Sequence, residues 1–576
     1  MATEKHLALY EEAKQAAPDQ QPALFAEACR VYEASNQRAP QDPEILYLWG
    51  SALIWLAGTQ DGAEALRNLK FACEKLAAAD AGEPGNYKTQ YNWGLALYRT
   101  ARANENGDER RRFLHEACRT FEAALAIKPH DNKTLSTWAN ALTMIGKMQK
   151  ELEAQKSFES ACEKYQAALA VKPGDPSTLF DWGFALYQLA ETQEGRAARA
   201  SLESACEKLK AILAVEPDNH VALNAWGVTL ASIVDTQEGS EARGTFKMAC
   251  EKYKAALATQ PVYHEALYNW ANALADIARE QKGAKQRRTF NAACRKYEAA
   301  LAAKPGDPWT LYNWGMHLYL IGCTPGTKTK QNVESACKKF EAALAGMPER
   351  NGTAGAGIPA KADVLNSWGN ALFFLTWFQA GEEEKRESLE AACEKYEAAL
   401  AVKPDGHLSL YDWGDALYRL ASTQEGTAAK QNVEAACEKF EATLACMSER
   451  NETADAGIPD KVDVLNKWAR ALRQLFRLTK DAAYLDQART VSQESEDRSG
   501  SPSYELAGVL ALQCRVAPAI VKLEACLEAT TLPPASDLDA NPDLDAIRND
   551  ARYLAFRQGL KRRTWVGRAL SWFMPT

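Results

Sequence analysis

The most regular feature of the chain is a spacing of apolar residues that recurs in pairs of segments. In residues 179–195 the apolar positions are Leu179, Trp182, Leu186 and Leu189. In residues 202–217 they are Leu202, Ala205, Cys206, Leu209 and Ile212. Steps of three and four residues place these side chains on one face of a helix. Each pair of segments therefore predicts two consecutive amphipathic helices, named helix A and helix B in chain order.

Such pairs repeat along nearly the whole chain. The tryptophans of helix A recur at intervals of 44 or 45 residues, at Trp49, Trp93, Trp138, Trp182, Trp226, Trp270 and Trp314, and Trp368, Trp413 and Trp468 continue the series. Ten cysteines follow an alanine and keep the same register, at Cys29, Cys73, Cys118, Cys162, Cys206, Cys250, Cys294, Cys337, Cys393 and Cys437. Two independent markers with one period indicate a repeat array.

Turn residues mark the ends of the predicted helices. The sequence Thr-Gln-Glu-Gly at 192–195 predicts that helix A ends at a left-handed glycine, and Lys-Pro-Gly-Asp at 172–175 ends the preceding helix B. Asp175 followed by Pro176 predicts an N-cap carboxylate and a first-turn proline for the next helix A, and Asp307 with Pro308 repeats this signal.

The unit resembles the tetratricopeptide repeat (TPR) motif. The matching positions are Trp182 and Gly183 in helix A, and Ala161, Tyr165, Ala168 and Pro173 in helix B and its end. The resemblance implies an all-α, right-handed superhelical solenoid, here of about 11–12 helical hairpins. The motif repeats every 34 residues, whereas this chain inserts ten residues between the A and B consensus positions. We expect both helices to be longer by a turn or more, which is similar, in this respect only, to the plant mitochondrial import receptor of the Tom20 type.

The register divides the chain into five parts. Residues 1–42 form an N-terminal capping half-repeat, 43–307 form six 44-residue TPR-like repeats, and 308–500 form TPR-like repeats with two Gly/Ala-rich inserts. Residues 501–536 form a last TPR of normal length, and 537–576 form a C-terminal cap and a basic amphipathic tail. The inserts, 349–360 and 449–460, are interpreted as surface loops or as partner contacts. The tail either caps the last hairpin or docks on a partner or a membrane surface.

Composition narrows the class of function. A net charge of −8 over 576 residues argues against a general nucleic-acid binder. No segment has 18 consecutive apolar residues, and the repeated cysteines occupy one packed position, so we expect a protein of the reducing cytoplasm. The chain contains none of the common nucleotide-binding, zinc-protease or serine-hydrolase motifs. We therefore expect no enzyme activity, no cofactor, no metal and no small-molecule substrate.

The resemblance places a binding groove on the faces of the A helices. Counting the consensus glycine as place 8, the predicted partner-binding residues are Tyr91, Asn92, Tyr98, Asn140, Phe180, Tyr187, Tyr268, Asn269, Asn272, Tyr312, Asn313, Tyr319, Asn370, Tyr411 and Tyr418. An asparagine side chain has both donors and acceptors and can pair with a peptide group of any sequence, while tyrosine gives rigid apolar contact. The alternative is that these aromatics pack between adjacent A helices. In the central repeats we expect Asn269 and Asn313, with their neighbouring tyrosines, to face one cavity.

The leading functional hypothesis is a non-catalytic scaffold or adaptor that binds a peptide or a partner protein in this groove. One alternative is a targeting or import-type receptor that works at a membrane surface through its C-terminal tail. Another is a regulatory subunit of an enzyme complex. The carboxylate clamp of some TPR proteins matches at Lys88, Asn92 and Lys133, but Ser136, Thr137 and Asp181 break the rest of the set. An acidic chaperone C-terminus is therefore not the expected ligand.

Overall fold

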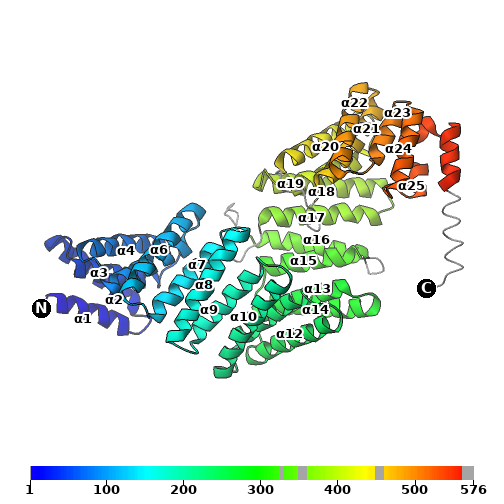
Figure 1. Cartoon of the computed structure of the whole chain (residues 1–576). Coiled ribbons are helices and arrows are strands. Elements are labelled where there is room, and N and C mark those ends of the chain that lie inside the picture. The colour runs from blue at the N-terminus through cyan, green and yellow to red at the C-terminus, as the bar shows by residue number, and fades with distance from the viewer. Residues whose placement is uncertain (1, 325–328, 348–359, 448–458, 561–576) are drawn as a thin grey trace. The chain divides into compact units, whose positions relative to one another are not determined.

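The computed structural model describes residues 2–324, 329–347, 360–447 and 459–560. These residues form helices joined by turns, and no strand occurs among them. Within each of the two compact units described below, consecutive helices pair as antiparallel hairpins that stack side by side (Figure 1). The all-α TPR solenoid expected from the sequence is confirmed.

The described residues contain twelve hairpins, in agreement with the predicted 11–12. Their A and B helices are α1 (Ala2–Gln15) and α2 (Gln21–Arg38), α3 (Pro43–Ala57) and α4 (Gly62–Gly82), α5 (Tyr87–Ala103) and α6 (Gly107–Ile127), α7 (Asn132–Gly146) and α8 (Glu151–Val171), α9 (Pro176–Ala190) and α10 (Gly195–Val215), α11 (His220–Val234) and α12 (Gly239–Thr259), α13 (His264–Glu280) and α14 (Gly283–Ala303), α15 (Pro308–Gly322) and α16 (Thr329–Ala345), α17 (Lys361–Leu375) and α18 (Glu382–Val402), α19 (His407–Ala421) and α20 (Gly426–Cys446), α21 (Lys461–Thr479) and α22 (Ala482–Ser499), and α23 (Tyr504–Leu512) and α24 (Val516–Glu528). The described chain also contains the short helices η1 (Thr376–Phe378), α25 (Ala535–Ala540) and η2 (Pro542–Ile547), and a last helical segment at 551–560.

The ten additional residues of each repeat lengthen both helices. The last hairpin has the normal motif length, with 9 residues in α23 and 13 in α24, whereas α9 has 15 and α10 has 21. Aligned on Gly183 and Gly508, three of the extra residues extend the end of helix A, six extend the start of helix B, and one lies in the turn. The prediction of a longer hairpin is confirmed, and more of the extra residues lengthen helix B than helix A.

The helix starts are built as the sequence predicts, but one glycine has another role. Asp175 accepts a hydrogen bond from the backbone N–H of Thr178 at 3.1 Å, and Asp307 accepts one from Thr310 at 3.0 Å. Gly195 is left-handed, with φ of +54°, yet it is the first residue of α10 and does not cap α9. The prediction that this glycine terminates helix A is wrong. Helix A ends at Ala190 with a right-handed C-cap, so the glycine instead turns the backbone into helix B.

One repeat places a non-glycine residue in this left-handed position. Glu151 begins α8 with φ of +47°, where the equivalent residues 62, 195, 239, 283 and 426 are all glycine. A side chain with a Cβ costs roughly 1–2 kcal/mol in this region of backbone conformation. Glu151→Gly should therefore stabilise the α7–α8 hairpin by about 1 kcal/mol, although glycine loses more entropy on folding. Hydrogen exchange of α8 would measure the gain, and Glu153→Gly in the same first turn, where no left-handed residue occurs, should destabilise.

In eight of the twelve hairpins a lysine from helix B stacks on the tryptophan of helix A. Eight such contacts have the ammonium nitrogen 3.7–4.5 Å from the indole ring centre, in the pairs Lys75–Trp49, Lys164–Trp138, Lys208–Trp182, Lys252–Trp226, Lys296–Trp270, Lys339–Trp314, Lys395–Trp368 and Lys439–Trp413. A cation over an indole face is attracted to it by about 0.5–2 kcal/mol. This lysine follows the repeated cysteine of helix B by two residues. One short sequence therefore supplies both the packed cysteine and the lysine that stacks on the tryptophan.

The repeated cysteines contribute packing and carry free thiols. Burial raises the pKa of the Cys118 thiol to about 11, while the indole N–H of Trp138 in the next repeat opposes the shift. The same arrangement holds for Cys393 with Trp413, where the pKa is raised to about 12. Because thiolates are the reactive form, the raised pKa leaves little reactive thiolate on these two cysteines at neutral pH.

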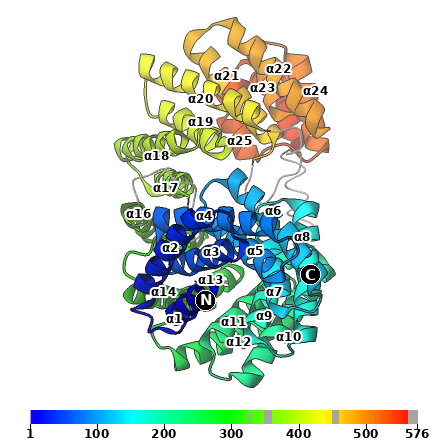
Figure 2. The same ribbon diagram turned by 90° about the vertical axis from the view of Figure 1, so that its left-hand side faces the viewer.

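The chain divides into two compact units, and the boundary runs through the α13–α14 hairpin. Unit 1 consists of residues 1–274 and 295–303, and unit 2 consists of residues 275–294 and 304–576. The cap of unit 2 is formed by α25, η2 and residues 551–560, whose apolar side chains pack with those of α23 and α24. Figure 2 shows α21 to α25 grouped together within this unit. The basic tail predicted beyond residue 560 and most of both predicted inserts lie outside the described residues.

Candidate partner-binding face

Within each unit four successive A helices contact one another in a row. In unit 1, α3 contacts α5, α5 contacts α7, and α7 contacts α9, and in unit 2 the same is true of α15, α17, α19 and α21. Twelve of the fifteen residues predicted to bind a partner lie on helices of these rows, the other three lie on α13, and all fifteen are partly exposed. Tyr268, Asn269 and Asn272 belong to unit 1, and Tyr312, Asn313 and Tyr319 belong to unit 2. That they face one cavity therefore stays a prediction.

Polar side chains at places 6 and 9 connect neighbouring A helices along this face, and we call these contacts rungs. The side-chain amide of Asn92, at place 6 of α5, donates to the hydroxyl of Ser51, at place 9 of α3, at 2.8 Å. At the same places in unit 2, Lys467 Nζ is 2.6 Å from Oδ2 of Asp415. The polar residues at places 6 and 9 therefore hold neighbouring repeats in register.

The asparagines at place 9 also accept a hydrogen bond from helix B of their own hairpin. The hydroxyl of Tyr165 donates to Asn140 at 2.5 Å, that of Tyr297 donates to Asn272 at 2.5 Å, and that of Tyr396 donates to Asn370 at 2.6 Å. The amide of Asn140 reaches Asp181 of the next repeat. An asparagine side chain has two donor hydrogens and one acceptor oxygen. These contacts leave each of these carboxamides at most part of its capacity for a partner's backbone.

Asn269 and Asn313 are engaged within the chain as well. The amide of Asn269 donates to Oδ1 of Asn224 at 3.2 Å, and the amide of Asn313 donates to the carbonyl oxygen of Trp309 at 3.0 Å. Truncating either side chain would remove an internal hydrogen bond in addition to any contact with a partner. A loss of affinity in such a variant would therefore need a stability control.

Several of the predicted tyrosines pack between helices. Tyr91, Tyr312 and Tyr411 at place 5 lie against Phe121, Phe340 and Phe440 of their own B helices, with ring centres 6.1–6.5 Å apart. The hydroxyl of Tyr187 accepts a hydrogen bond from Ser232 of the next A helix at 3.3 Å. The structure thus gives these aromatics a packing role and leaves one part of each ring surface exposed.

Unit 2 carries aromatic and cationic side chains together on this face. Trp377 in η1 is 61% exposed, the guanidinium carbon of Arg419 lies 4.7 Å from its ring centre, and the same carbon lies 4.8 Å from that of Phe373. Tyr319, from α15, contacts Phe374 edge-on at 6.0 Å. These residues come from three successive A helices and the short η1 that follows α17.

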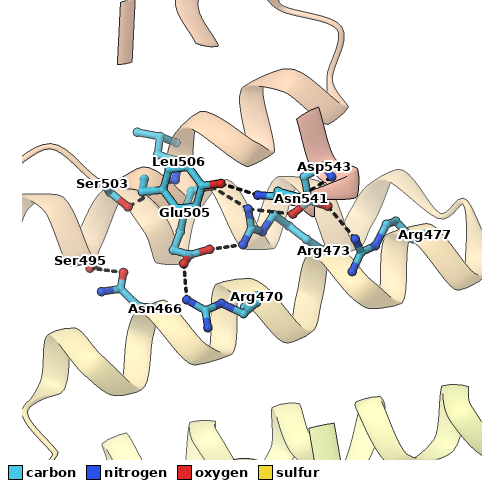
Figure 3. Close-up of polar contacts among 11 residues, drawn as sticks. Asn466, Arg470, Arg473, Arg477, Ser495, Ser503, Glu505, Leu506, Asn541 and Asp543 are labelled. Atoms are coloured by element: carbon cyan, nitrogen blue, oxygen red, sulfur yellow. Dashed lines mark hydrogen bonds and ion pairs between the residues drawn. The ribbon is translucent and has the colours of Figure 1, made fainter. Parts of the chain in front are cut away.

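A buried ion cluster ends the row at α21. Arg473 is 2% exposed and pairs with the carboxylates of Glu505 from α23 and Asp543 from η2 (Figure 3). Arg470 binds the second oxygen of Glu505 at 2.7 Å, and Arg477 binds that of Asp543 at 3.1 Å (Figure 3). Burial alone would raise the pKa of Glu505, but the charges of Arg473 and Arg470 hold it below its usual value. The cluster ties three segments of unit 2 together.

Asp412, at place 6 of α19, is a carboxyl group with a perturbed pKa. Burial raises its pKa from 3.8 to about 6, while hydrogen bonds from Asn370 and Asn366 and the charge of Lys467 oppose the shift. The Asn366 amide donates to it at 3.3 Å. Asp412 therefore takes part in the polar contacts between α17 and α19, where burial makes its negative charge unfavourable. Among the described residues, no group of three histidine, cysteine or acidic side chains is arranged to hold a metal ion.

Comparison with known proteins gives the family. The profile of the family described as plant specific mitochondrial import receptor subunit TOM20 matches residues 80–178, 170–269 and 351–455, together just over half of the chain. The chain belongs to this family. Each of the three TOM20-type matches spans two lengthened hairpins, namely α5–α8, α9–α12 and α17–α20. No curated protein sequence matches the chain.

Solved structures similar to this TOM20-family chain are TPR proteins. A TPR protein from Parabacteroides merdae is 13% identical, with 56% of this chain and 99% of that chain covered and a TM-score of 0.33. The C-terminal part of a TPR protein from Cytophaga hutchinsonii is 13% identical, with 54% and 98% covered and a TM-score of 0.36. YrrB, described as a TPR protein with an unusual peptide-binding site, is 16% identical, with 41% and 96% covered and a TM-score of 0.29.

Two features of the TOM20-type chain are not predicted by its sequence analysis. The ion cluster of Arg473 was detectable only as a break in the pattern, since place 12 is aromatic in α5, α9, α15, α17 and α19 but arginine in α21. Trp377 was signalled by the aromatic run 373–378, which has no counterpart in the other repeats, whereas Arg419 lies on α19, outside this run. Neither signal shows which side chains stack.

Proposed function

We propose that this chain is a non-catalytic scaffold that binds a peptide segment or a partner protein along the faces of its A helices. The supporting observation is the row of four contacting A helices in each unit, on which aromatic side chains stay partly exposed although polar rungs already link the helices. Side chains with exposed ring surface on a rigid support are typical of protein-binding sites. We also propose that the protein acts in the cytoplasm.

Site-specific photocrosslinking tests this proposal. A photoreactive phenylalanine analogue would replace Phe184 on α9, which is 43% exposed, and in a second variant Trp377, which is 61% exposed. A matched control replaces Met248 on α12, which is 47% exposed but lies on a B helix. We expect discrete crosslinked protein partners from the two A-face positions and none from the control. If the Met248 variant captures the same partners with equal yield, binding does not take place on the A face.

A second candidate is an import-type receptor that works at a membrane surface. It is favoured by the family match, whose description is that of a mitochondrial import receptor subunit. The described residues contain no helix that is long and apolar enough to cross a membrane. The receptor hypothesis therefore needs residues 561–576, which include four basic side chains, to attach the chain to the lipid.

Deleting residues 561–576 separates the two candidates. The full chain and the truncated chain would be mixed with vesicles that contain phosphatidylcholine and an anionic lipid and separated by flotation. The receptor hypothesis expects flotation that is lost on truncation, while A-face crosslinking is retained. If both chains stay in the soluble fraction, attachment through this tail is excluded and the scaffold hypothesis stands alone.

A further inference from the structure

Part of the A-helix face in unit 2 combines exposed rings with cations whose hydrogen-bonding capacity is not used up. We name it the arginine–aromatic surface and define it by Phe373, Trp377, Tyr418, Arg419 and Arg470. Its side chains come from α17, η1, α19 and α21, and the charge of Arg470 acts on the Tyr418 hydroxyl. All five lie within unit 2.

Arg419 stacks on two rings and has only a long ion pair with a carboxylate. Its guanidinium lies within 5 Å of the ring centres of both Phe373 and Trp377, at 4.8 and 4.7 Å. Oδ2 of Asp415 is 4.0 Å from its Nε, beyond hydrogen-bond distance, and that carboxylate is bound by Lys467 at 2.6 Å. A guanidinium stacked on aromatic faces keeps its N–H edge free, and that edge matches a carboxylate in two-point geometry.

One repeat further on, an acidic segment of the chain binds arginines of the same helix face. Residues 537–547, Asp-Leu-Asp-Ala-Asn-Pro-Asp-Leu-Asp-Ala-Ile, lie against α21 and α23. Asp543 of this segment binds Arg473 and Arg477 at 3.0 and 3.1 Å, and Leu538, Leu544 and Ile547 are completely buried beside it. The chain thus occupies the arginines of α21 with an acidic, leucine-containing segment of its own.

Arg470 links the two regions. It lies on the same helix as Arg473, its side chain is 50% exposed, and it binds Glu505 through Nη2 at 2.7 Å. From this residue the face continues to Tyr418 and Arg419 on α19 and then to the rings of α17 and η1. The internal segment covers the arginines at 473 and 477, and no described segment covers the indole of Trp377.

We propose that the arginine–aromatic surface is a docking site for an acidic segment of a partner protein that carries leucines between its aspartates or glutamates. Its carboxylates bind the free edges of Arg419 and Arg470, as the carboxylate of Asp543 binds Arg473 and Arg477 one repeat further on, and its leucines lie on Trp377 and Phe373. This inference rests on the proposed function, and it states the chemistry of the partner for this part of the face.

A peptide with the sequence of residues 537–547, labelled with fluorescein, tests the proposal on the full chain by fluorescence anisotropy. We expect saturable binding that weakens as salt is raised, because exposed charge pairs are screened. Trp377→Ala and Arg419→Gln should each weaken binding by about tenfold, which corresponds to 1.4 kcal/mol. Arg489→Gln, on α22, changes an exposed arginine outside the surface and should leave the affinity unchanged. Circular dichroism would establish that each variant is folded.

Two control ligands sharpen the result. The same peptide with its four aspartates changed to asparagine should bind at least tenfold more weakly. A basic amphipathic targeting peptide should not compete. The proposal is overturned if the acidic peptide binds more weakly than about 1 mM, or if the basic peptide binds in its place. It is also overturned if Trp377→Ala and Arg419→Gln leave binding unchanged, because the peptide would then be exchanging with the internal segment at Arg473.

Crosslinking of a partner at Trp377 would persist in any of these cases if the scaffold function is correct, so the two proposals fail separately.

Discussion

Replacing Arg473 with methionine should destabilise the C-terminal hairpins, α21 to α24, by about 3–5 kcal/mol. Arg473 is 2% exposed and neutralises Glu505 and Asp543, which are 5% and 4% exposed. Without the guanidinium, two carboxylates remain buried with only the more peripheral Arg470 and Arg477 as partners. Removing one member of a buried ion group costs more than the group contributes, because the remaining charges stay in a medium that solvates them poorly.

Hydrogen exchange followed by mass spectrometry is the measurement, because stability in a repeat array is local. Protection should fall in α21, α23 and residues 541–547 and remain unchanged in α5–α10 of unit 1. The triple variant Arg473→Met, Glu505→Gln, Asp543→Asn should recover most of the loss, since it removes the uncompensated charges together. If Arg473→Met alone leaves the exchange of α23 as in the parent, the cluster does not hold the cap.

Asp412→Asn should stabilise unit 2 at neutral pH by about 1–3 kcal/mol. Burial raises the pKa of Asp412 from 3.8 to about 6, so the folded chain binds its proton more tightly than the unfolded chain does. Stability is therefore full below pH 4, falls as pH rises from about 4 to about 6, and stays lower above that window. Asparagine removes the charge and keeps hydrogen-bonding capacity, and the chain already uses it at this place in Asn92, Asn269 and Asn313.

Thermal unfolding of parent and variant at pH 4 and pH 7.5 checks the sign. The melting temperature of the variant should exceed that of the parent at pH 7.5 and approach it at pH 4. Asp415→Asn, three residues along the same helix, is the matched control: it removes the partner of Lys467 and should destabilise slightly at pH 7.5. If Asp412→Asn raised the melting temperature by the same amount at both pH values, ionisation of Asp412 could not be the cause of the gain.

The architecture was predictable because each repeat carries redundant signals. Trp182, Gly183 and the turn around Asp175 point independently to the same hairpin, and they do so repeatedly along the chain. The role of Gly195 was not predictable from its four-residue context, since a glycine of left-handed conformation can end one helix or begin the next. Only the three-dimensional position of the turn distinguishes these cases.

The sequence was sufficient to predict which helix face carries the candidate site. That the fifteen residues contact a partner remains a prediction. The counting rule places all fifteen residues on partly exposed positions of A helices, but it cannot show what else their side chains touch. Asn140 is bound by Tyr165, which is 25 residues away, and Asn269 is bound to Asn224, which is 45 residues away. Such pairings depend on the stacking of hairpins, and a single helix pattern contains no information on them.

The rungs at places 6 and 9 also limit the ways in which the repeats can be assembled. Nearly identical hairpins are prone to dock in the wrong sequence or to exchange between two copies of a chain. The junctions here are of several kinds: an amide meets a hydroxyl between α5 and α3, an ammonium meets a carboxylate between α21 and α19, and an amide meets a carboxyl both between α7 and α9 and between α17 and α19. A hairpin moved to a junction of another kind, by misfolding or by unequal recombination of its gene, would lose its own rung. The differences between junctions therefore disfavour some wrong orders of repeats that are otherwise alike.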